Sequence, residues 1–276
     1  MKVVLFCGGQ GLRLREYSEA VPKPMVPIGT RPMLWHLMRY YAHFGHREFV
    51  LCLGYQGEVI KTYFRSYDET ISNDFVLSDG GRSVELLGSD IDDWRITFAS
   101  TGLETNVGQR LMAVRRFVAD EPMFLANYGD NLSDANLDEY VADFQQRSEV
   151  AAFLSVRPSY TFHVVESDGA GLVTGIEHVH DSAIRINGGF FLFRPEIFDY
   201  IEPGEELVEE PFRRLIAERQ LIAYRYDGFW APMDTLKDKV MLESLETSGQ
   251  APWALWNRGP AGGGARIPVP DAGTGG

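Results

Sequence analysis

A glycine-rich segment near the start of the chain holds the first residues that could do chemistry. The apolar run Val3-Val4-Leu5-Phe6 leads into Cys7-Gly8-Gly9-Gln10-Gly11-Leu12-Arg13, and Lys23 follows between two prolines. Closely spaced glycines let the backbone turn sharply and bring its N–H groups near anionic oxygens, which a Cβ atom would obstruct. The flanking prolines hold Lys23 on extended backbone, beside the second cation, Arg13. The segment therefore predicts a polyphosphate site made of Gly8, Gly9, Gly11, Arg13 and Lys23.

Two widespread phosphate-binding patterns do not fit this segment. The dinucleotide pattern G-x-G-x-x-G requires a glycine at the position of Leu14. The ATP-binding pattern G-x-x-x-x-G-K-[ST] is absent from the sequence. A glycine turn between a strand and a helix is common in itself, so the interpretation depends on other motifs.

Further short motifs recur along most of the chain. In order they are Lys23-Pro24-Met25-Val26-Pro27-Ile28-Gly29, Gly54-Tyr55-Gln56-Gly57, Tyr128-Gly129-Asp130, Ile186-Asn187-Gly188-Gly189, Pro232-Met233-Asp234-Thr235 and Ala251-Pro252-Trp253. Together they resemble the sugar-1-phosphate nucleotidyltransferases, and most closely the glucose-1-phosphate cytidylyltransferases. The resemblance implies a Mg²⁺-dependent transfer of a nucleoside monophosphate from a triphosphate, with CTP favoured, to a sugar 1-phosphate or sugar-like phosphate. It also implies a homo-oligomer.

The resemblance assigns roles on the nucleotide side. Asp130 and Asp234 match metal-binding aspartates, and two carboxylates from distant segments suit Mg²⁺, which also takes phosphate oxygens and water. Arg13 would hold the β- and γ-phosphates and Lys23 the α-phosphate, so Arg13, Lys23 and Asp130 form the expected catalytic set. Arg110 and Gly129 would lie near the nucleotide. Asp234 is also placed to cap a following helix, and Arg110 also fits the polar face of a helix.

On the acceptor side the resemblance points to Asn187, Gly188, Glu177 and His178. The family has a lysine where His178 stands, a threonine at Leu12 and a glycine at Gln109. Two alternatives explain these departures: a changed acceptor, or a noncatalytic nucleotide-binding or scaffolding homologue. We favour the first, because all triphosphate and metal residues are present. A histidine beside a phosphate dianion would have its charged form favoured.

Composition restricts the class of partner and the compartment. A formal net charge of −13 opposes nonspecific binding of nucleic acid and makes a local cation such as Mg²⁺ necessary for a triphosphate. No run approaches the roughly 20 apolar residues of a membrane span. The two cysteines, Cys7 and Cys52, each lie in an apolar run and are expected to be buried, reduced thiols. We therefore expect a cytoplasmic protein that does not contact a membrane.

These residues need a scaffold that brings distant segments together. Strand-like runs at 3–7, 48–53, 94–99, 123–128 and 150–156 alternate with helical patterns at 31–45, 56–65, 107–118 and 136–147. This order predicts an α/β, Rossmann-like, mostly parallel sheet with helices on both faces, whose ligands bind at the carboxyl ends of the strands. Shorter β-like pieces at 157–193 predict a small antiparallel insertion beside the acceptor pocket. Helices at 195–201, 209–220 and 236–247 follow. We expect a single domain over 1–256, closed by helices at 226–256, and a flexible tail at 257–276.

Overall fold

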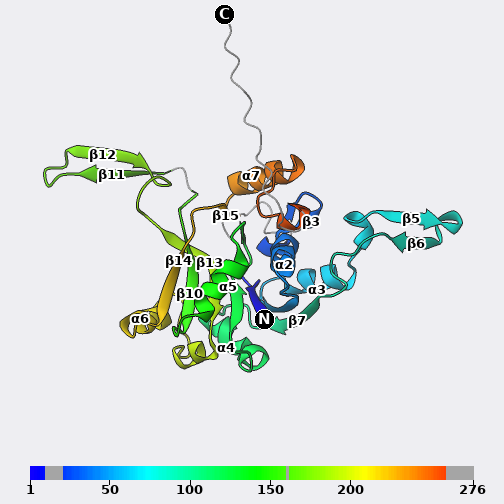
Figure 1. Cartoon of the computed structure of the whole chain (residues 1–276), viewed down its shortest axis with the longest axis horizontal. Coiled ribbons are helices and arrows are strands. Elements are labelled where there is room, and N and C mark those ends of the chain that lie inside the picture. The colour runs from blue at the N-terminus through cyan, green and yellow to red at the C-terminus, as the bar shows by residue number, and fades with distance from the viewer. Residues whose placement is uncertain (10–20, 160–161, 259–276) are drawn as a thin grey trace, which may run out of the picture.

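The centre of the computed structural model is a seven-stranded sheet (Figure 1), and the structure describes residues 1–9, 21–159 and 162–258. All neighbouring strands run parallel except where β13 lies antiparallel between β8 and β10. The mostly parallel sheet expected from the sequence is therefore confirmed. Its spatial order is β14 (Leu221–Arg225), β10 (Ala151–Val156), β13 (Ile186–Phe193), β8 (Phe124–Asn127), β1 (Lys2–Phe6), β4 (Glu48–Leu53) and β7 (Arg95–Ser100).

Helices cover both faces of this sheet, because successive strand residues point to opposite sides. Val3 and Leu5 of β1 pack with one set of helices, and Val4 and Phe6 pack with the other. The first set is α2 (Met33–His43), α3 (Gly57–Arg65) and α5 (Leu137–Gln145). The second set is α4 (Val107–Val118) and α6 (Glu210–Ala217), with the 3₁₀ turn η5 (Pro195–Asp199). The expected helix at 195–201 is thus this shorter 3₁₀ turn.

Two helices begin at capping boxes that the sequence encodes. The Asn106 side chain accepts from Gln109 N at 2.9 Å, and Gln109 Oε1 accepts from Asn106 N at 3.0 Å. Thr235 and Asp238 form the same reciprocal pair at the start of α7 (Leu236–Thr247). Such boxes satisfy backbone donors that the first helical turn leaves open. Gln109, a departure from the family pattern, is therefore used to begin α4.

Four short antiparallel pairs complete the strands. Within 157–193, β13 belongs to the central sheet, and only β11 and β12 form a separate hairpin. Figure 1 shows this hairpin and the β5–β6 hairpin projecting from opposite ends of the molecule. The pairs are β2 (Pro27–Ile28) with β3 (Arg31–Pro32), β5 (Phe75–Ser78) with β6 (Ser83–Leu86), β9 (Asn131–Ser133) with β15 (Trp230–Pro232), and β11 (His163–Ser167) with β12 (Val173–His178).

The remaining turns are short 3₁₀ segments. They are η2 (Lys23–Met25), η3 (Glu69–Ile71), η4 (Asp79–Gly81) and η6 (Leu255–Arg258). The last of these extends into the segment expected as a tail, and 259–276 lie outside the described residues.

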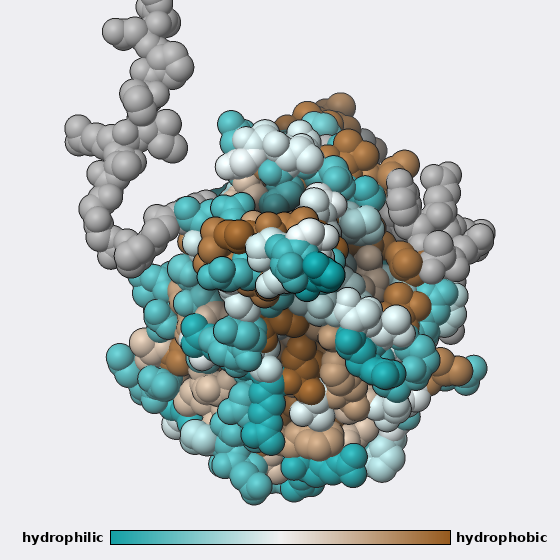
Figure 2. Space-filling model, turned by 90° about the vertical axis from the view of Figure 1, so that its right-hand side faces the viewer, coloured by the Kyte–Doolittle hydropathy of each residue, from teal (hydrophilic) through white to brown (hydrophobic). Residues whose placement is uncertain are grey.

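Both projecting hairpins carry exposed apolar side chains. Leu77 is 59% exposed on β5, and Ile176 is 68% exposed on β12. Figure 2 views the molecule from the side of the β5–β6 hairpin, where brown apolar surface lies among teal polar surface. These hairpins contrast with the central sheet, whose strands are largely buried.

The two cysteines lie buried on neighbouring strands, and neither is in a disulfide. Cys7 N donates to Cys52 O at 3.0 Å, which continues the pairing of β1 with β4 by one residue. Burial raises the pKa of Cys52 to about 12, so its protonated form is favoured. Over the described ranges, every helix is too short or too polar to cross a bilayer.

Candidate active site

The carboxyl edge of the central sheet brings most of the expected site residues together. Gly8 and Gly9 follow β1, and Gly129 and Asp130 follow β8, its parallel neighbour. Gly129 has φ +80°, and a Cβ there would lie 3.1 Å from Phe6 O. The turn that carries Asp130 therefore packs directly against the end of β1, where the glycine segment begins.

Asp130 and Asp234 are placed side by side by a short antiparallel pair. Asp130 precedes β9 and Asp234 follows β15, and the register joins Asn131 to Pro232. A backbone hydrogen bond from Met233 N to Asp130 O, 2.9 Å, extends this pairing. Residues separated by more than a hundred positions thus reach the same point.

The ammonium of Lys23 lies between these two carboxylates. Its Nζ donates to Asp130 Oδ2 at 2.7 Å and to Asp234 Oδ1 at 2.5 Å. The side chains are 12%, 28% and 20% exposed for Lys23, Asp130 and Asp234, so the cluster lies in a recess rather than on the open surface. The two carboxylates therefore lie on either side of a single cationic group.

Burial and charge act against each other in this cluster. Burial alone would lower the pKa of Lys23, but Asp130 and Asp234 outweigh it, and the net pKa is raised. Burial raises the pKa of Asp130, and the Lys23 ammonium opposes this shift. A carboxylate pair in such a place needs a cation to remain fully ionised.

The donor set suits a hard divalent cation. Carboxylate oxygens are the protein ligands that Mg²⁺ takes, usually one or two of them, with waters and substrate oxygens completing the shell. Within the described part of the chain, no group of three or more His, Cys, Asp or Glu side chains could hold a metal. The two aspartates therefore fit a magnesium site that substrate phosphates complete, and they do not fit an all-protein site.

Arg110 is buried at the start of the glycine segment and does not lie on an exposed polar face of α4. Its side chain is 4% exposed, and its guanidinium donates to Thr101 Oγ1 at 2.8 Å and to Gly102 O and Gly8 O at 3.1 Å each. A Cβ on Gly8 would lie 2.0 Å from Arg110 Nη1. Arg110 therefore stabilises the start of the glycine segment, and its guanidinium donors are used by Thr101, Gly102 and Gly8.

Two expected phosphate ligands cannot be placed. Gly11 and Arg13 lie in 10–20, outside the described residues. Gly9 is exposed, and a Cβ on it would meet no atom of the described residues beyond its chain neighbours within 4 Å.

On the acceptor side, the structure places Asn187 and Gly188 at the start of β13, next to the aspartates. Asn187 Nδ2 donates to Tyr128 Oη at 3.2 Å, and Trp230 Nε1 donates to Gly188 O at 2.8 Å. Tyr128 lies two positions before Asp130 in the chain. These bonds tie the acceptor side to the turn that carries the metal candidate.

Glu177 and His178 are placed less directly. Both lie at the end of β12, where Glu177 is exposed, and His178 packs against His163 with ring centroids 5.5 Å apart. His178 Nδ1 accepts from His180 N at 3.1 Å. In the described part of the chain, no hydrogen bond joins Glu177 or His178 to Lys23, Asp130 or Asn187.

The sequence analysis did not single out three arginines that lie near Asn187. Arg157, Arg185 and Arg225 all contact Asp227. One signal was available, because the sequence has no lysine between Lys61 and Lys237 and every strong cation of the acceptor half is therefore an arginine.

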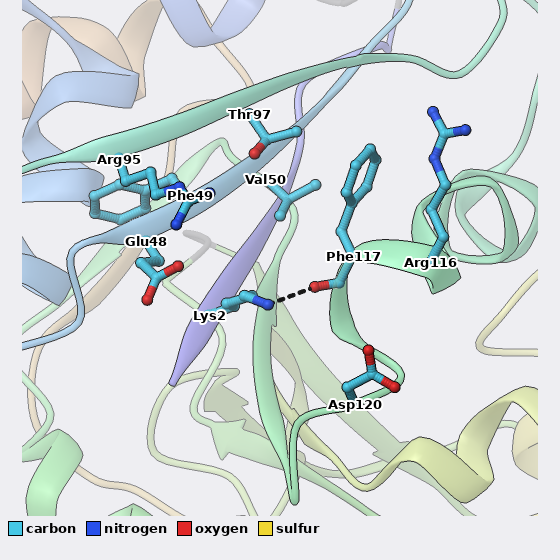
Figure 3. A pocket seen from close by; sticks show the side chains of 9 residues that line it. All are labelled: Lys2, Glu48, Phe49, Val50, Arg95, Thr97, Arg116, Phe117 and Asp120. Carbon is cyan, nitrogen blue, oxygen red and sulfur yellow. Dashed lines mark hydrogen bonds between the residues drawn. The ribbon is translucent and has the colours of Figure 1, made fainter.

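A separate hollow of about 190 Å³ lies at the opposite, amino-terminal edge of the sheet (Figure 3). There Lys2 donates to Phe117 O at 2.9 Å and pairs with Glu121 at 3.0 Å. The hollow is lined by both positive and negative side chains, and none of the predicted site residues belongs to the lining. The lining residues are Lys2, Glu48, Phe49, Val50, Arg95, Thr97, Arg116, Phe117 and Asp120.

Comparison with known proteins agrees with this geometry. A sequence model described as nucleotidyl transferase matches residues 2–237. The chain is 36% identical over 258 residues to a Bacillus subtilis (strain 168) protein named "probable glucose-1-phosphate cytidylyltransferase", covering 93% of this chain and 100% of that one. It is 35% identical over 257 residues to the glucose-1-phosphate cytidylyltransferase of Salmonella typhi, with the same coverages. A solved UDP-glucose pyrophosphorylase complexed with UDP-glucose has the same fold, with TM-score 0.65, 15% identity, and coverage of 90% of this chain and 98% of that one.

Proposed function

The chain belongs to the nucleotidyl transferase family, and we propose that it transfers the cytidylyl group of CTP to a sugar 1-phosphate or a sugar-like phosphate. Nucleotidyl transfer to a sugar 1-phosphate is the activity of the relatives that match the whole chain. The choice of CTP is supported by the names of those relatives. The observation that carries the proposal is the meeting of Lys23, Asp130 and Asp234 at the carboxyl edge of the sheet.

The reaction balances without a side-chain base. An oxygen of the acceptor phosphate forms a bond to the α-phosphorus of the triphosphate, the bond from that phosphorus to the bridging β-oxygen breaks, and pyrophosphate leaves. A phosphate monoester has a second pKa near 6 and is mostly dianionic at neutral pH, so the nucleophile needs no deprotonation. The protein has to align two anions and stabilise the charge between them.

The metal in this proposal is Mg²⁺, and Asp130 and Asp234 would hold it. When bound, Mg²⁺ supplies positive charge to the phosphate oxygens and neutralises the charge that develops on them. Lys23 lies within hydrogen-bond distance of both carboxylates, and the same ammonium would contact the α-phosphate. Gly8 and Gly9 would present backbone N–H groups to the phosphates, with Arg13 and Gly11 beyond them in the chain. Asn187 and Gly188 would contact the acceptor.

The assembly and compartment are further parts of the proposal. We expect a homo-oligomer, and the exposed apolar side chains of the two projecting hairpins support self-association. A cytoplasmic location is supported by the two buried cysteines, neither of which is in a disulfide. The mass in solution, measured by light scattering, tests the first of these.

Pyrophosphate release tests the activity. The full chain is assayed with each ribonucleoside triphosphate against glucose 1-phosphate and other sugar or cyclitol phosphates, with Mg²⁺ and with EDTA. We expect release with CTP and a sugar 1-phosphate, and none with EDTA. The noncatalytic alternative predicts tight triphosphate binding and no release from any pair.

A further inference from the structure

Three arginines line a pocket of about 340 Å³ beside the acceptor residues. Arg157 follows β10, Arg225 ends β14, and Arg185 precedes β13. Because β10 and β14 are parallel and β13 is antiparallel to β10, these positions meet at the carboxyl end of β10. Asp181, Ser182 and Ala183 complete the lining. We refer to this hollow as the arginine pocket.

A single carboxylate, Asp227, contacts all three guanidinium groups. Arg157 Nε lies 3.1 Å from Asp227 Oδ1, Arg225 Nε lies 3.4 Å from Oδ2, and Arg185 Nη2 also donates to Oδ1. Hydrogen bonds from Arg157 and then Arg185 lower the pKa of Asp227, which keeps it ionised. Even with Asp181 counted, the pocket has one more positive than negative charge.

The three arginines differ in how many contacts their guanidinium groups make with the rest of the fold. Arg185 also donates to Ser155 O at 2.8 Å and to Tyr226 O at 3.1 Å, so it ties strand ends together. Arg157 also donates to His180 O at 2.7 Å. Arg225 is 67% exposed, and among the described residues it forms an ion pair with Asp227 alone, at 3.4 Å. Its planar fork of donors is therefore available to an oxyanion, which guanidinium groups bind in bidentate fashion.

The arginine pocket lies on the same edge of the sheet as the residues proposed to contact the acceptor. Along the carboxyl edge the strand order β14, β10, β13, β8 places the arginine pocket first, then Asn187, then Asp130. Since β10 lies two strands and β14 three strands from β8, the strand ends that carry the arginines are roughly 10–15 Å from the end of β8. This separation is comparable with the length of a sugar that carries an anionic group at each end.

We propose that the arginine pocket binds a second anionic group of the acceptor, a phosphate or a carboxylate, at the end of the molecule far from its reacting phosphate. The acceptor is then a sugar-like 1-phosphate with an additional negative charge. This inference rests on the proposed function, and it narrows the class of acceptor.

Matched acceptors test the proposal on the full chain. Glucose 1-phosphate is compared with glucose 1,6-bisphosphate and with glucuronic acid 1-phosphate at saturating CTP and Mg²⁺. We expect kcat/KM to be about tenfold higher, or more, for an acceptor with a second anionic group, and Arg225→Gln to reduce this preference about tenfold. Arg213→Gln, an exposed arginine of α6, is the control and should leave the preference unchanged.

Several outcomes would overturn the assignment. Equal kcat/KM for acceptors with one and with two anionic groups would do so, as would an Arg225→Gln effect that is the same for all acceptors. If millimolar inorganic phosphate raises turnover of glucose 1-phosphate and Arg225→Gln removes this effect, the pocket serves a free anion and not the acceptor.

Absence of pyrophosphate from every pair of substrates would contradict the proposed function instead of the assignment of the pocket. Calorimetric titration with glucose 1,6-bisphosphate then still tests the pocket, because weaker binding to Arg225→Gln than to Arg213→Gln supports it and equal binding contradicts it.

Discussion

At the scale of single residues, Asp130 is the group whose removal should affect the chemistry most. We expect Asp130→Asn to lower kcat/KM at least about 100-fold, because the amide cannot supply the charge that the metal and the phosphates require. Pyrophosphate release at several Mg²⁺ concentrations measures the effect, which should include a raised Mg²⁺ requirement. Asp143→Asn, on the surface of α5, is the control. Activity within about threefold of wild type would refute the assignment of Asp130 to the metal.

We predict that Arg110 contributes to the stability of the folded protein. Arg110→Met would leave Gly8 O, Gly102 O and Thr101 Oγ1 without their buried donor, and we expect the free energy of unfolding to fall by about 2–4 kcal/mol. Urea denaturation measures it. Arg116→Met, exposed on the same helix, should change it by less than about 0.5 kcal/mol. Equal effects of the two substitutions would show that the Arg110 contacts are not important to the fold.

At the scale of elements, the sequence predicts those whose pattern is regular and local. The bounds of α4 and β4 agree with expectation, because capping residues and an apolar run mark them directly. β14 was not predicted: it is a half-exposed edge strand that depends on its partner β10. The β5–β6 hairpin was also missed, although Gly80 and Gly81 stand between two apolar runs, a common hairpin signal.

The sequence predicts which segments form the candidate site, but it does not predict all of the contacts within the site. The types and order of Lys23, Asp130 and Asp234 identify the segments, and topology brings them together. The burial of Arg110 beneath Gly8 depends on how α4 packs on the sheet, which periodicity does not specify. The arginine pocket depends on the ends of three strands meeting, one of which, β14, was not recognised.

Two neighbouring glycines of the loop after β1 should respond differently to substitution. In Gly8→Ala, the new Cβ would overlap the Arg110 guanidinium, so we expect lower stability and weaker triphosphate binding. In Gly9→Ala, the Cβ would contact no other part of residues 1–9, 21–159 and 162–258, so the melting temperature should stay unchanged. Thermal unfolding and CTP titration separate the two. Weaker CTP binding by Gly9→Ala at unchanged stability would place the ligand against Gly9, and a lowered melting temperature for Gly9→Ala would contradict the geometry.

At the scale of the whole molecule, the site is assembled from segments that span most of the chain. A ligand that contacts several of them binds the folded state only, so it should raise the Tm. We expect CTP with Mg²⁺ to raise the Tm more than the sum of the shifts with CTP alone and Mg²⁺ alone, and EDTA to remove the excess. Asp234→Asn should abolish the excess. Shifts that simply add would contradict a shared metal and nucleotide site.

The stability of the whole molecule should also depend on pH through a buried histidine. His36 is 1% exposed and joins α2 to β2 and to the C-terminal segment: its Nε2 lies 2.9 Å from Ile28 O, and its Nδ1 accepts from Trp253 Nε1 at 3.3 Å. Since Nδ1 accepts, the ring is neutral with its proton on Nε2. Burial lowers the pKa of His36 from 6.5 to about 4.

The sign of the dependence follows from proton binding. Between pH 6.5 and about 4 the unfolded chain binds a proton at His36 that the folded chain does not, so stability is complete above pH 6.5 and falls as the pH falls through this window. We expect His36 to account for about 2 kcal/mol of unfolding free energy lost between pH 7.5 and pH 5. Urea denaturation at both values measures this loss, which should be smaller by that amount in His36→Gln and unchanged in the exposed control His180→Gln. An identical loss in wild type and His36→Gln would show that the pKa of His36 is the same in the folded and unfolded chains, which would contradict the lowering of this pKa by burial.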